Sequence, residues 1–151
     1  MYTTVLILHS WLRWIALVGG VGATLAAFRA GEAGGSARAE RWGLVLLIAL
    51  DIQMLLGLLL YLVLSPNMKA ILDNFGAAMQ DSTLRFLAVE HITMMLVAVI
   101  LVHVGRVLAR KAKTPAATRT RLLVCFGLAT IAMIVAIPWP GMTNGRPLFR
   151  V

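Results

Sequence analysis

Residues 42–64 read WGLVLLIALDIQMLLGLLLYLVL, an apolar run interrupted by one charged residue, Asp51. A helix needs about 20 predominantly apolar residues to cross the hydrocarbon core of a bilayer. Three further runs, at about 3–28, 83–110 and 116–137, are long and apolar enough to do the same. We therefore expect an all-α integral membrane protein in which residues 1–151 form a single transmembrane domain of four spans.

The composition agrees with this fold class. Hydrophobic residues make up 60% of the chain and charged residues 13%, whereas soluble domains average about 45–50% and about 25%. Four spans with short connections use nearly the whole chain, so the composition excludes a separate soluble catalytic domain.

The net charge of +8 would suggest a polyanionic partner in a soluble protein, but the basic residues here lie mostly between the apolar runs. Loops rich in Lys and Arg stay on the cytoplasmic side. We therefore expect a multi-pass protein of the bacterial inner membrane, with both termini outside, membrane lipid around it and no nucleic-acid partner. The basic residues behind this prediction are Arg29, Arg38 and Arg41 in the first loop, and Arg106, Arg110, Lys111, Lys113, Arg119 and Arg121 around the third.

Turn-forming residues separate the spans. The glycine-rich residues 31–36 end the first span, and Ser65-Pro66 stops the second. Asp81 or Ser82 can cap the third span, which breaks at 111–115, and residues 138–141 close the fourth.

Short connections between four spans predict an up-down four-helix transmembrane bundle. Between spans two and three, apolar residues recur at helical spacing from Met68 to Met79. This pattern predicts a short interfacial helix on the outer surface.

Ionisable side chains occur inside two spans, where they are costly and usually functional. His9 and Arg13 share a helix face in the first span, and Glu90 and His91 lie at a similar depth in the third. In an up-down bundle these two spans stand diagonally across the core. Two histidines on diagonal helices at one level can hold one haem iron between two imidazoles. We therefore expect His9 and His91 to be metal ligands of a haem b.

The neighbours of the two histidines extend this hypothesis. Arg13 would hold a haem propionate or neutralise Glu90. Small residues in both spans can admit either a flat ring or a neighbouring helix. They are Gly57 in span two and Gly19, Gly20, Gly22 and Ala23 in span one. Two other interpretations stay open: a structural hydrogen-bonded network made by the same polar residues, and a metal or proton site.

Asp51 and Gln53 point about 200° apart around the second span, so both cannot face one narrow core. Gln53 shares a face with Gly57 and is expected inside, where it would add a hydrogen bond beside the cofactor. Asp51 is expected to point to a helix edge, to another subunit, or toward span one or three. An unpaired carboxylate in lipid is costly, which favours an oligomer or a larger complex.

His103 lies about 18 Å beyond His91 along the third span, near the cytoplasmic edge. It is expected to be interfacial, where it is able to bind a phospholipid or quinone headgroup. The chain has 3 histidines, so His103 has no second histidine with which to form another bis-His haem site.

Four segments resemble a family of small bacterial four-span proteins labelled "cytochrome b" or left uncharacterised: Leu8–Trp14, Gln53–Tyr61, Leu84–His91 and Ile137–Pro140. The resemblance covers nearly the whole chain. It implies a four-helix bundle with a b-type haem held at the positions of His9 and His91. Cytochrome b proteins usually have two pairs of ligand histidines, and this chain departs from that pattern.

These observations predict a haem b-binding electron-transfer component without catalytic residues of its own. It would pass electrons between the quinol pool and a periplasmic acceptor, or sense or store haem. The alternative is a non-catalytic accessory subunit of a larger respiratory or photosynthetic complex. A (bacterio)chlorophyll-binding bundle is a third option, because an imidazole also ligates magnesium.

Overall fold

The computed structural model describes residues 1–31 and 35–150, and helices account for most of them, with no strand in these two ranges. Four helical segments are long and apolar enough to cross a membrane, as the hydropathy predicted. They are α1 (Tyr2–Phe28), α2 with the π-helical turn η1 (Gly35–Leu59 and Leu60–Leu64), α5 with the π-helical turn η2 and α6 (Ser82–Arg85, Phe86–Glu90 and His91–Arg110), and α7 (Pro115–Ala136).

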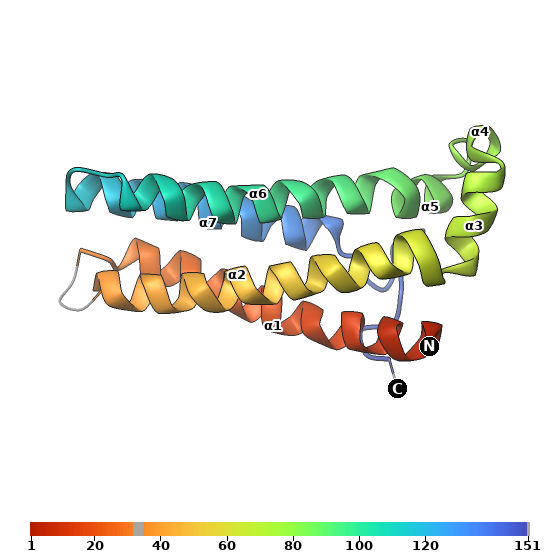
Figure 1. The fold of residues 1–151 in the computed structure, drawn as a ribbon, viewed down its shortest axis with the longest axis horizontal. Coiled ribbons are helices and arrows are strands. Elements are labelled where there is room, and N and C mark those ends of the chain that lie inside the picture. Colours follow the sequence, from red (N-terminus) through yellow and green to blue (C-terminus); the bar gives the residue numbers. More distant parts are fainter. Residues whose placement is uncertain (32–34, 151) are drawn as a thin grey trace.

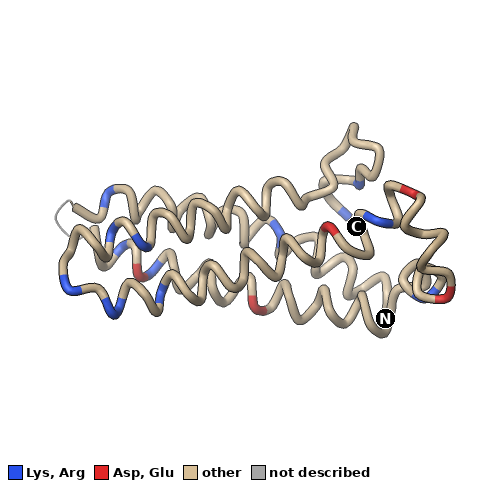
Figure 2. Tube along the Cα trace, turned by 90° about the horizontal axis from the view of Figure 1, so that it is seen from above, with Lys and Arg blue, Asp and Glu red and all other residues tan. Residues whose placement is uncertain are grey.

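The long helices lie side by side (Figure 1). Helix α1 packs on α2 and α7, and α6 packs on α7 and α2, so α1 and α6 stand opposite each other. Both termini lie at the same end as the short helices α3 (Pro66–Asp73) and α4 (Phe75–Ala78). Figure 2 shows Lys and Arg gathered around the other end, where α1 connects to α2 and α6 connects to α7.

Most helix boundaries follow the turn chemistry in the sequence. The Ser65 hydroxyl accepts a hydrogen bond from the Met68 amide, so Ser65 caps α3 and Pro66 occupies its first turn. The Asp81 carboxylate accepts from the Thr83 and Leu84 amides and caps α5. The connection between the second and third spans contains two short helices, α3 and α4, where one was predicted.

The second span begins earlier than its hydropathy indicated. Helix α2 starts at Gly35 rather than at Trp42, because residues 36–41 include Ala, Arg and Glu, which form helix well outside an apolar run. Part of the predicted glycine-rich break therefore belongs to α2. The remainder, residues 32–34, lies outside the described residues.

Small residues let the long helices approach closely. A Cβ on Gly19 would contact the backbone of Leu46, and one on Gly20 would lie 2.7 Å from Met133 Cε. Ala23 and Phe126 are fully buried, whereas large aliphatic side chains such as Leu55 face outward. The glycines of α1 therefore admit neighbouring helices, and the broad apolar exterior is that of a protein surrounded by an apolar medium.

Candidate functional site

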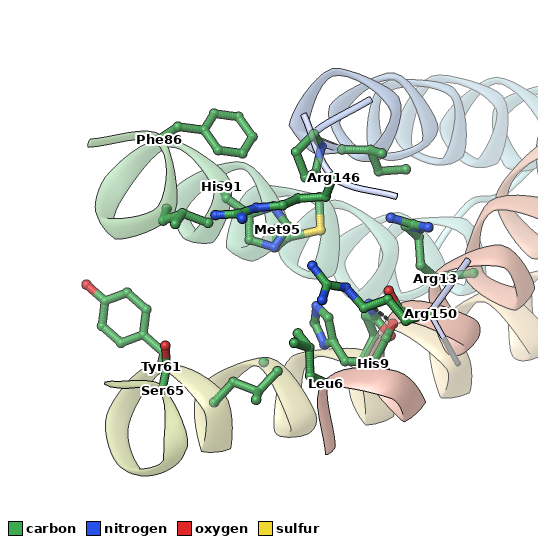
Figure 3. A pocket seen from close by; sticks show the side chains of 18 of the residues that line it. Leu6, His9, Arg13, Tyr61, Ser65, Phe86, His91, Met95, Arg146 and Arg150 are labelled. Carbon is green, nitrogen blue, oxygen red and sulfur yellow. Dashed lines mark hydrogen bonds between the residues drawn. The ribbon is translucent and has the colours of Figure 1, made fainter. Parts of the chain in front are cut away.

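A cavity of about 270 Å³ opens at the end of the long helices that carries both termini (Figure 3). Its walls come from α1, α2 with η1, η2 with α6, the end of α7 and the segment after it. His9, Arg13, Gln53 and His91, four of the five predicted site residues, all line this cavity. A smaller cavity of about 50 Å³ touches the same two histidines from the side of α2 and α6.

The rings of His9 and His91 meet across this space. Their centroids are 6.3 Å apart and their planes are inclined by 69°. The two residues are 82 positions apart in the sequence, on helices that stand opposite each other. The structure therefore brings together the two imidazoles that the sequence analysis paired.

The ring of His91 is held in a defined orientation. Its Nδ1 lies 2.8 Å from the main-chain oxygen of Ala136, at the end of α7. Since a carbonyl only accepts, Nδ1 carries the proton, and the neutral ring keeps a free lone pair on Nε2. A hydrogen bond from the second nitrogen to a carbonyl is the usual support of a metal-binding histidine.

The ring of His9 has weaker support. Its Nδ1 is buried and has no hydrogen-bond partner, although the main-chain carbonyl of Gln53 faces the ring. Gly57 makes room for this ring, because a Cβ at that position would lie 3.2 Å from His9 Cε1. Gly57 therefore accommodates an imidazole.

Gln53 is buried, as predicted, but its partner differs from the prediction. Its Nε2 donates to the main-chain oxygen of His9 at 2.9 Å, so it braces the backbone of α1 rather than the ring. Its Oε1 is buried without a hydrogen-bond partner. A buried polar atom of this kind calls for an explanation, such as a ligand or water in the cavity.

Two π-helical turns, which were not predicted from the sequence, lie close to the histidines. Turn η1 contains Tyr61 and turn η2 ends immediately before His91. The Tyr61 hydroxyl donates to the carbonyl of Ala88 at 2.8 Å and thereby joins the two turns. Single π turns inside α-helices frequently occur at functional sites. Both turns lie on the cavity wall.

Arg13 also lines the cavity, but its guanidinium reaches the C-terminal segment. Its Nη2 donates to the carbonyl of Leu148, while its Nε is buried without a partner. Two further arginines, Arg146 and Arg150, line the same cavity from that segment. Neither residue was predicted from the sequence, because no spacing pattern relates residues 146–150 to the first span.

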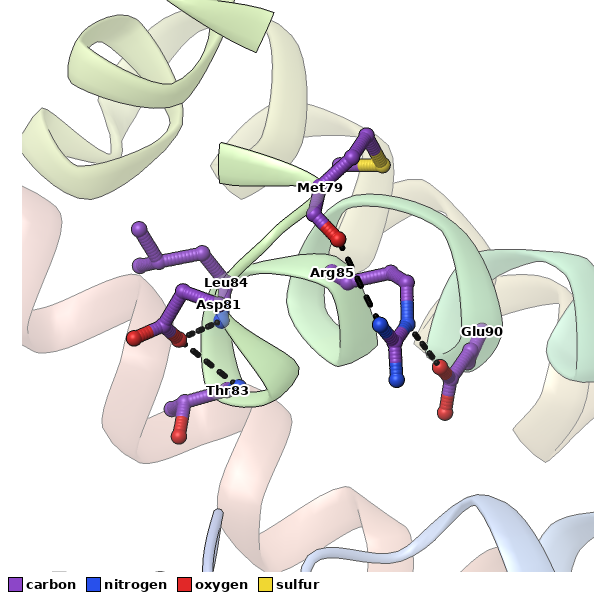
Figure 4. Close-up of polar contacts among 6 residues, drawn as sticks. All are labelled: Met79, Asp81, Thr83, Leu84, Arg85 and Glu90. Atoms are coloured by element: carbon purple, nitrogen blue, oxygen red, sulfur yellow. Dashed lines mark hydrogen bonds and ion pairs between the residues drawn. The ribbon is translucent and has the colours of Figure 1, made fainter. Parts of the chain in front are cut away.

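The structure does not bring Glu90 into the cavity. Its carboxylate accepts from Arg85 Nε at 3.0 Å, and both side chains are about half exposed (Figure 4). Residues five apart do not face each other on an α-helix, but the i to i+5 geometry of η2 places them together. Arg85 also donates to the carbonyl of Met79. The predicted pairing of Arg13 with Glu90 is thus replaced by Arg85 with Glu90.

Asp51 points toward the third span, one of the directions expected for it. Its Oδ2 lies 3.5 Å from Nε2 of His103, and both side chains are partly exposed. The other ring nitrogen of His103 lies 3.0 Å from the carbonyl of Val99 and must donate to it. On a neutral ring, Nε2 of His103 then carries a lone pair and not a proton. It therefore attracts the Asp51 carboxylate only when a proton lies between them.

Among the described residues, no group of three or more His, Cys, Asp or Glu side chains is arranged to hold a metal ion. Comparison with protein-family models, with curated proteins and with solved structures finds no match to this chain.

Proposed function

We propose that the protein binds one haem b between His9 and His91 and acts as an electron-transfer component of the cell envelope. The observation that carries the proposal is the distance of 6.3 Å between the two ring centroids. Imidazole nitrogens bind metals at about 2.0–2.1 Å, which places two rings on opposite sides of one metal about 6.2–6.6 Å apart. The separation of the two rings falls in this interval.

The unpartnered polar atoms favour a ligand over a purely structural network. A network that only joins the helices satisfies its buried donors and acceptors, since each unsatisfied atom costs about 1–3 kcal/mol. Here three buried atoms next to the cavity are unsatisfied: His9 Nδ1, Arg13 Nε and Gln53 Oε1. Atoms held in this way are suited to a bound group.

The residues of the chain would have distinct roles toward the haem. His91 and His9 would supply the axial nitrogens, with the Ala136 carbonyl fixing the ring of His91. Gln53 would keep the His9 segment in register through the His9 carbonyl. The haem iron supplies one-electron oxidation and reduction when bound, and its potential is set by these ligands and by the charges around them.

The size of the cavity sets a condition on binding. Its volume of about 270 Å³ is slightly below the range of small-molecule sites, which span about 300–1,000 Å³. The smaller cavity also touches both histidines and adds space lined by residues of α2 and α6. A porphyrin would need the long side chains at the cavity mouth to move outward.

The membrane arrangement belongs to the same proposal. An up-down four-helix bundle with its basic end in the bacterial cytoplasm would put both termini, and the cavity, near the outer face of the inner membrane. Helices α3 and α4 would then lie at the outer interface. The quinol pool would be the electron source, and a periplasmic protein the acceptor.

The direct test is the optical spectrum of the purified protein before and after reduction with dithionite. We expect a reduced α-band at about 560 nm, the usual range for a bis-His haem b, and its loss in His9→Ala and His91→Ala. His103→Ala is the matched control and should keep the band. A colourless protein that takes up no haem would overturn the proposal, and magnesium in the extracted pigment would replace it with a chlorophyll site.

A further inference from the structure

The segment after α7 lies across α1 at the mouth of the cavity. Trp11 Nε1 donates to the carbonyl of Arg150 at 2.9 Å, and Trp14 Nε1 donates to that of Leu148 at 3.2 Å. Arg13 donates to the same Leu148 carbonyl. Three side chains from a single turn of α1 thus hold the main chain of residues 148–150.

Aromatic packing adds to these hydrogen bonds. The ring of Phe149 lies 5.3 Å from Trp11 and 5.5 Å from Trp14, between centroids. Trp14 also meets Trp139 at 6.2 Å, and the amide of Arg146 donates to the carbonyl of Pro138 at 3.0 Å. The segment is therefore held by contacts along its length. These contacts fix the main chain at Arg146 and Arg150 beside the cavity.

This anchoring places an excess of positive charge around the cavity. Arg13, Arg146 and Arg150 all line it, together with two imidazoles, whereas no Asp or Glu side chain is among its described lining residues. Arg13 and Arg150 are close enough for their charges to repel. Figure 3 shows Arg146 and Arg150 reaching from their segment toward the space around His9 and His91.

Uncompensated charge near an apolar core is costly unless a partner of opposite charge is present. Among the described residues that line this cavity, none is an acidic partner for Arg146 or Arg150. Guanidinium groups bind carboxylates and phosphates through paired hydrogen bonds. The missing negative charge is therefore best supplied by the ligand.

We propose that the C-terminal segment is part of the ligand site and that Arg146 and Arg150, together with Arg13, bind acidic groups of the ligand. This inference rests on the proposed function and deepens it: the two propionates of the haem are the acidic groups. The shared chemistry is an oxyanion held by guanidinium, and an anionic phospholipid headgroup is the other source of it.

The test measures how much the acidic groups of the ligand contribute to binding, apart from its ring and iron. The ligand-free protein is titrated with haem b and with its dimethyl ester, which has the same ring and iron but no carboxylate. We expect the ester to bind at least about 10-fold more weakly, as for the loss of one or two charge-assisted hydrogen bonds. The variant Arg146→Gln/Arg150→Gln should lose a similar factor for haem and nothing for the ester.

Two variants make the comparison specific. Arg119→Gln changes an arginine at the opposite end of the molecule, where its guanidinium lies over Phe28, and should bind both porphyrins as the parent does. Arg146→Lys/Arg150→Lys keeps the charge and should recover part of the affinity for haem. A second readout is the reduction potential of the haem-loaded protein, which should fall in the double Gln variant because positive charge favours the reduced form.

The outcomes distinguish this inference from the proposed function. Equal binding of haem and ester, with His91-dependent spectra, would overturn the role of the arginines and leave the haem site standing. If neither porphyrin binds, the proposed function fails, and native mass spectrometry of protein purified with phosphatidylglycerol decides the inference. Retention of that lipid by the parent and its loss from the double Gln variant would support an anion site for lipid, whereas no retention would overturn it.

Discussion

Gln53 offers the sharpest test of the idea that the cavity keeps polar atoms unpaired for a ligand. Its side chain is 7% exposed, donates one hydrogen bond to the His9 carbonyl, and leaves Oε1 buried without a partner. Replacing it with Leu, a side chain of similar size, removes about 0.5–1.5 kcal/mol of hydrogen bonding and relieves about 1–3 kcal/mol of unpaired desolvation.

The ligand-free Gln53→Leu protein should therefore be more stable than the parent, by about 1 kcal/mol. The assay is unfolding of the detergent-solubilised protein by sodium dodecyl sulfate, followed by circular dichroism. The affinity for haem should change in the opposite direction and fall about 10-fold, equivalent to about 1.4 kcal/mol. The physical reason is that Leu neither braces the His9 segment nor offers an acceptor to a bound group.

Gln80→Leu is the control, because Gln80 is exposed in the turn before α5 and its replacement should change stability by less than about 0.5 kcal/mol. A ligand-free Gln53→Leu protein that is less stable than the parent by more than about 1 kcal/mol would refute the reasoning. Such a result would mean that Gln53 Oε1 has a hydrogen-bond partner in solution. Only two of the three unpartnered atoms would then support a ligand.

Two further predictions concern contacts between the long helices away from the cavity. A Cβ on Gly105 would overlap the Cβ of Cys125, so Gly105→Ala should force α6 and α7 apart and cost about 1–3 kcal/mol in the same unfolding assay. Adding Cys125→Gly should recover most of the loss. His103→Leu should cost less than about 1 kcal/mol, because the Asp51–His103 pair that it removes is partly exposed. Replacing both Asp51 and His103 with Leu should cost less than His103→Leu alone.

A matched variant controls the Gly105 experiment. Gly127→Ala lies on α7, where an added Cβ meets only Thr24 Cγ2 at 3.8 Å, and it should leave stability unchanged. Equal costs for Gly105→Ala and Gly127→Ala would show that close approach at Gly105 is unimportant. Additive losses in the Asp51 and His103 double variant would show that the two side chains do not interact.

The sequence predicted those features that depend on local hydropathy and on turn residues. Four runs long enough to cross a membrane give four long helices, the second of which ends before Ser65 as predicted, and Asp81 caps α5. The inward position of Gln53 was also predictable, because two residues about 200° apart on one helix cannot share a narrow face.

The partners of the polar side chains were less predictable. The π turn η2 adds a residue to the helical register before His91, which rotates all later side chains by about 100° relative to a regular helix. A helical wheel therefore cannot pair Glu90 with Arg85. Such turns are stabilised by tertiary contacts, here the bond between Tyr61 and Ala88, and these contacts join residues far apart in the chain.

The amino-acid sequence by itself determined how many apolar helices the chain forms, where most of them end, and that His9 and His91 sit at comparable depths. Only the tertiary structure decided that the two rings lie 6.3 Å apart and that Arg146 and Arg150 join them at one cavity. Hydropathy and capping act between neighbours in the chain, so they can be recognised locally. The cavity depends on how α1 packs with the segment after α7, and such contacts between residues more than a hundred positions apart leave no local pattern.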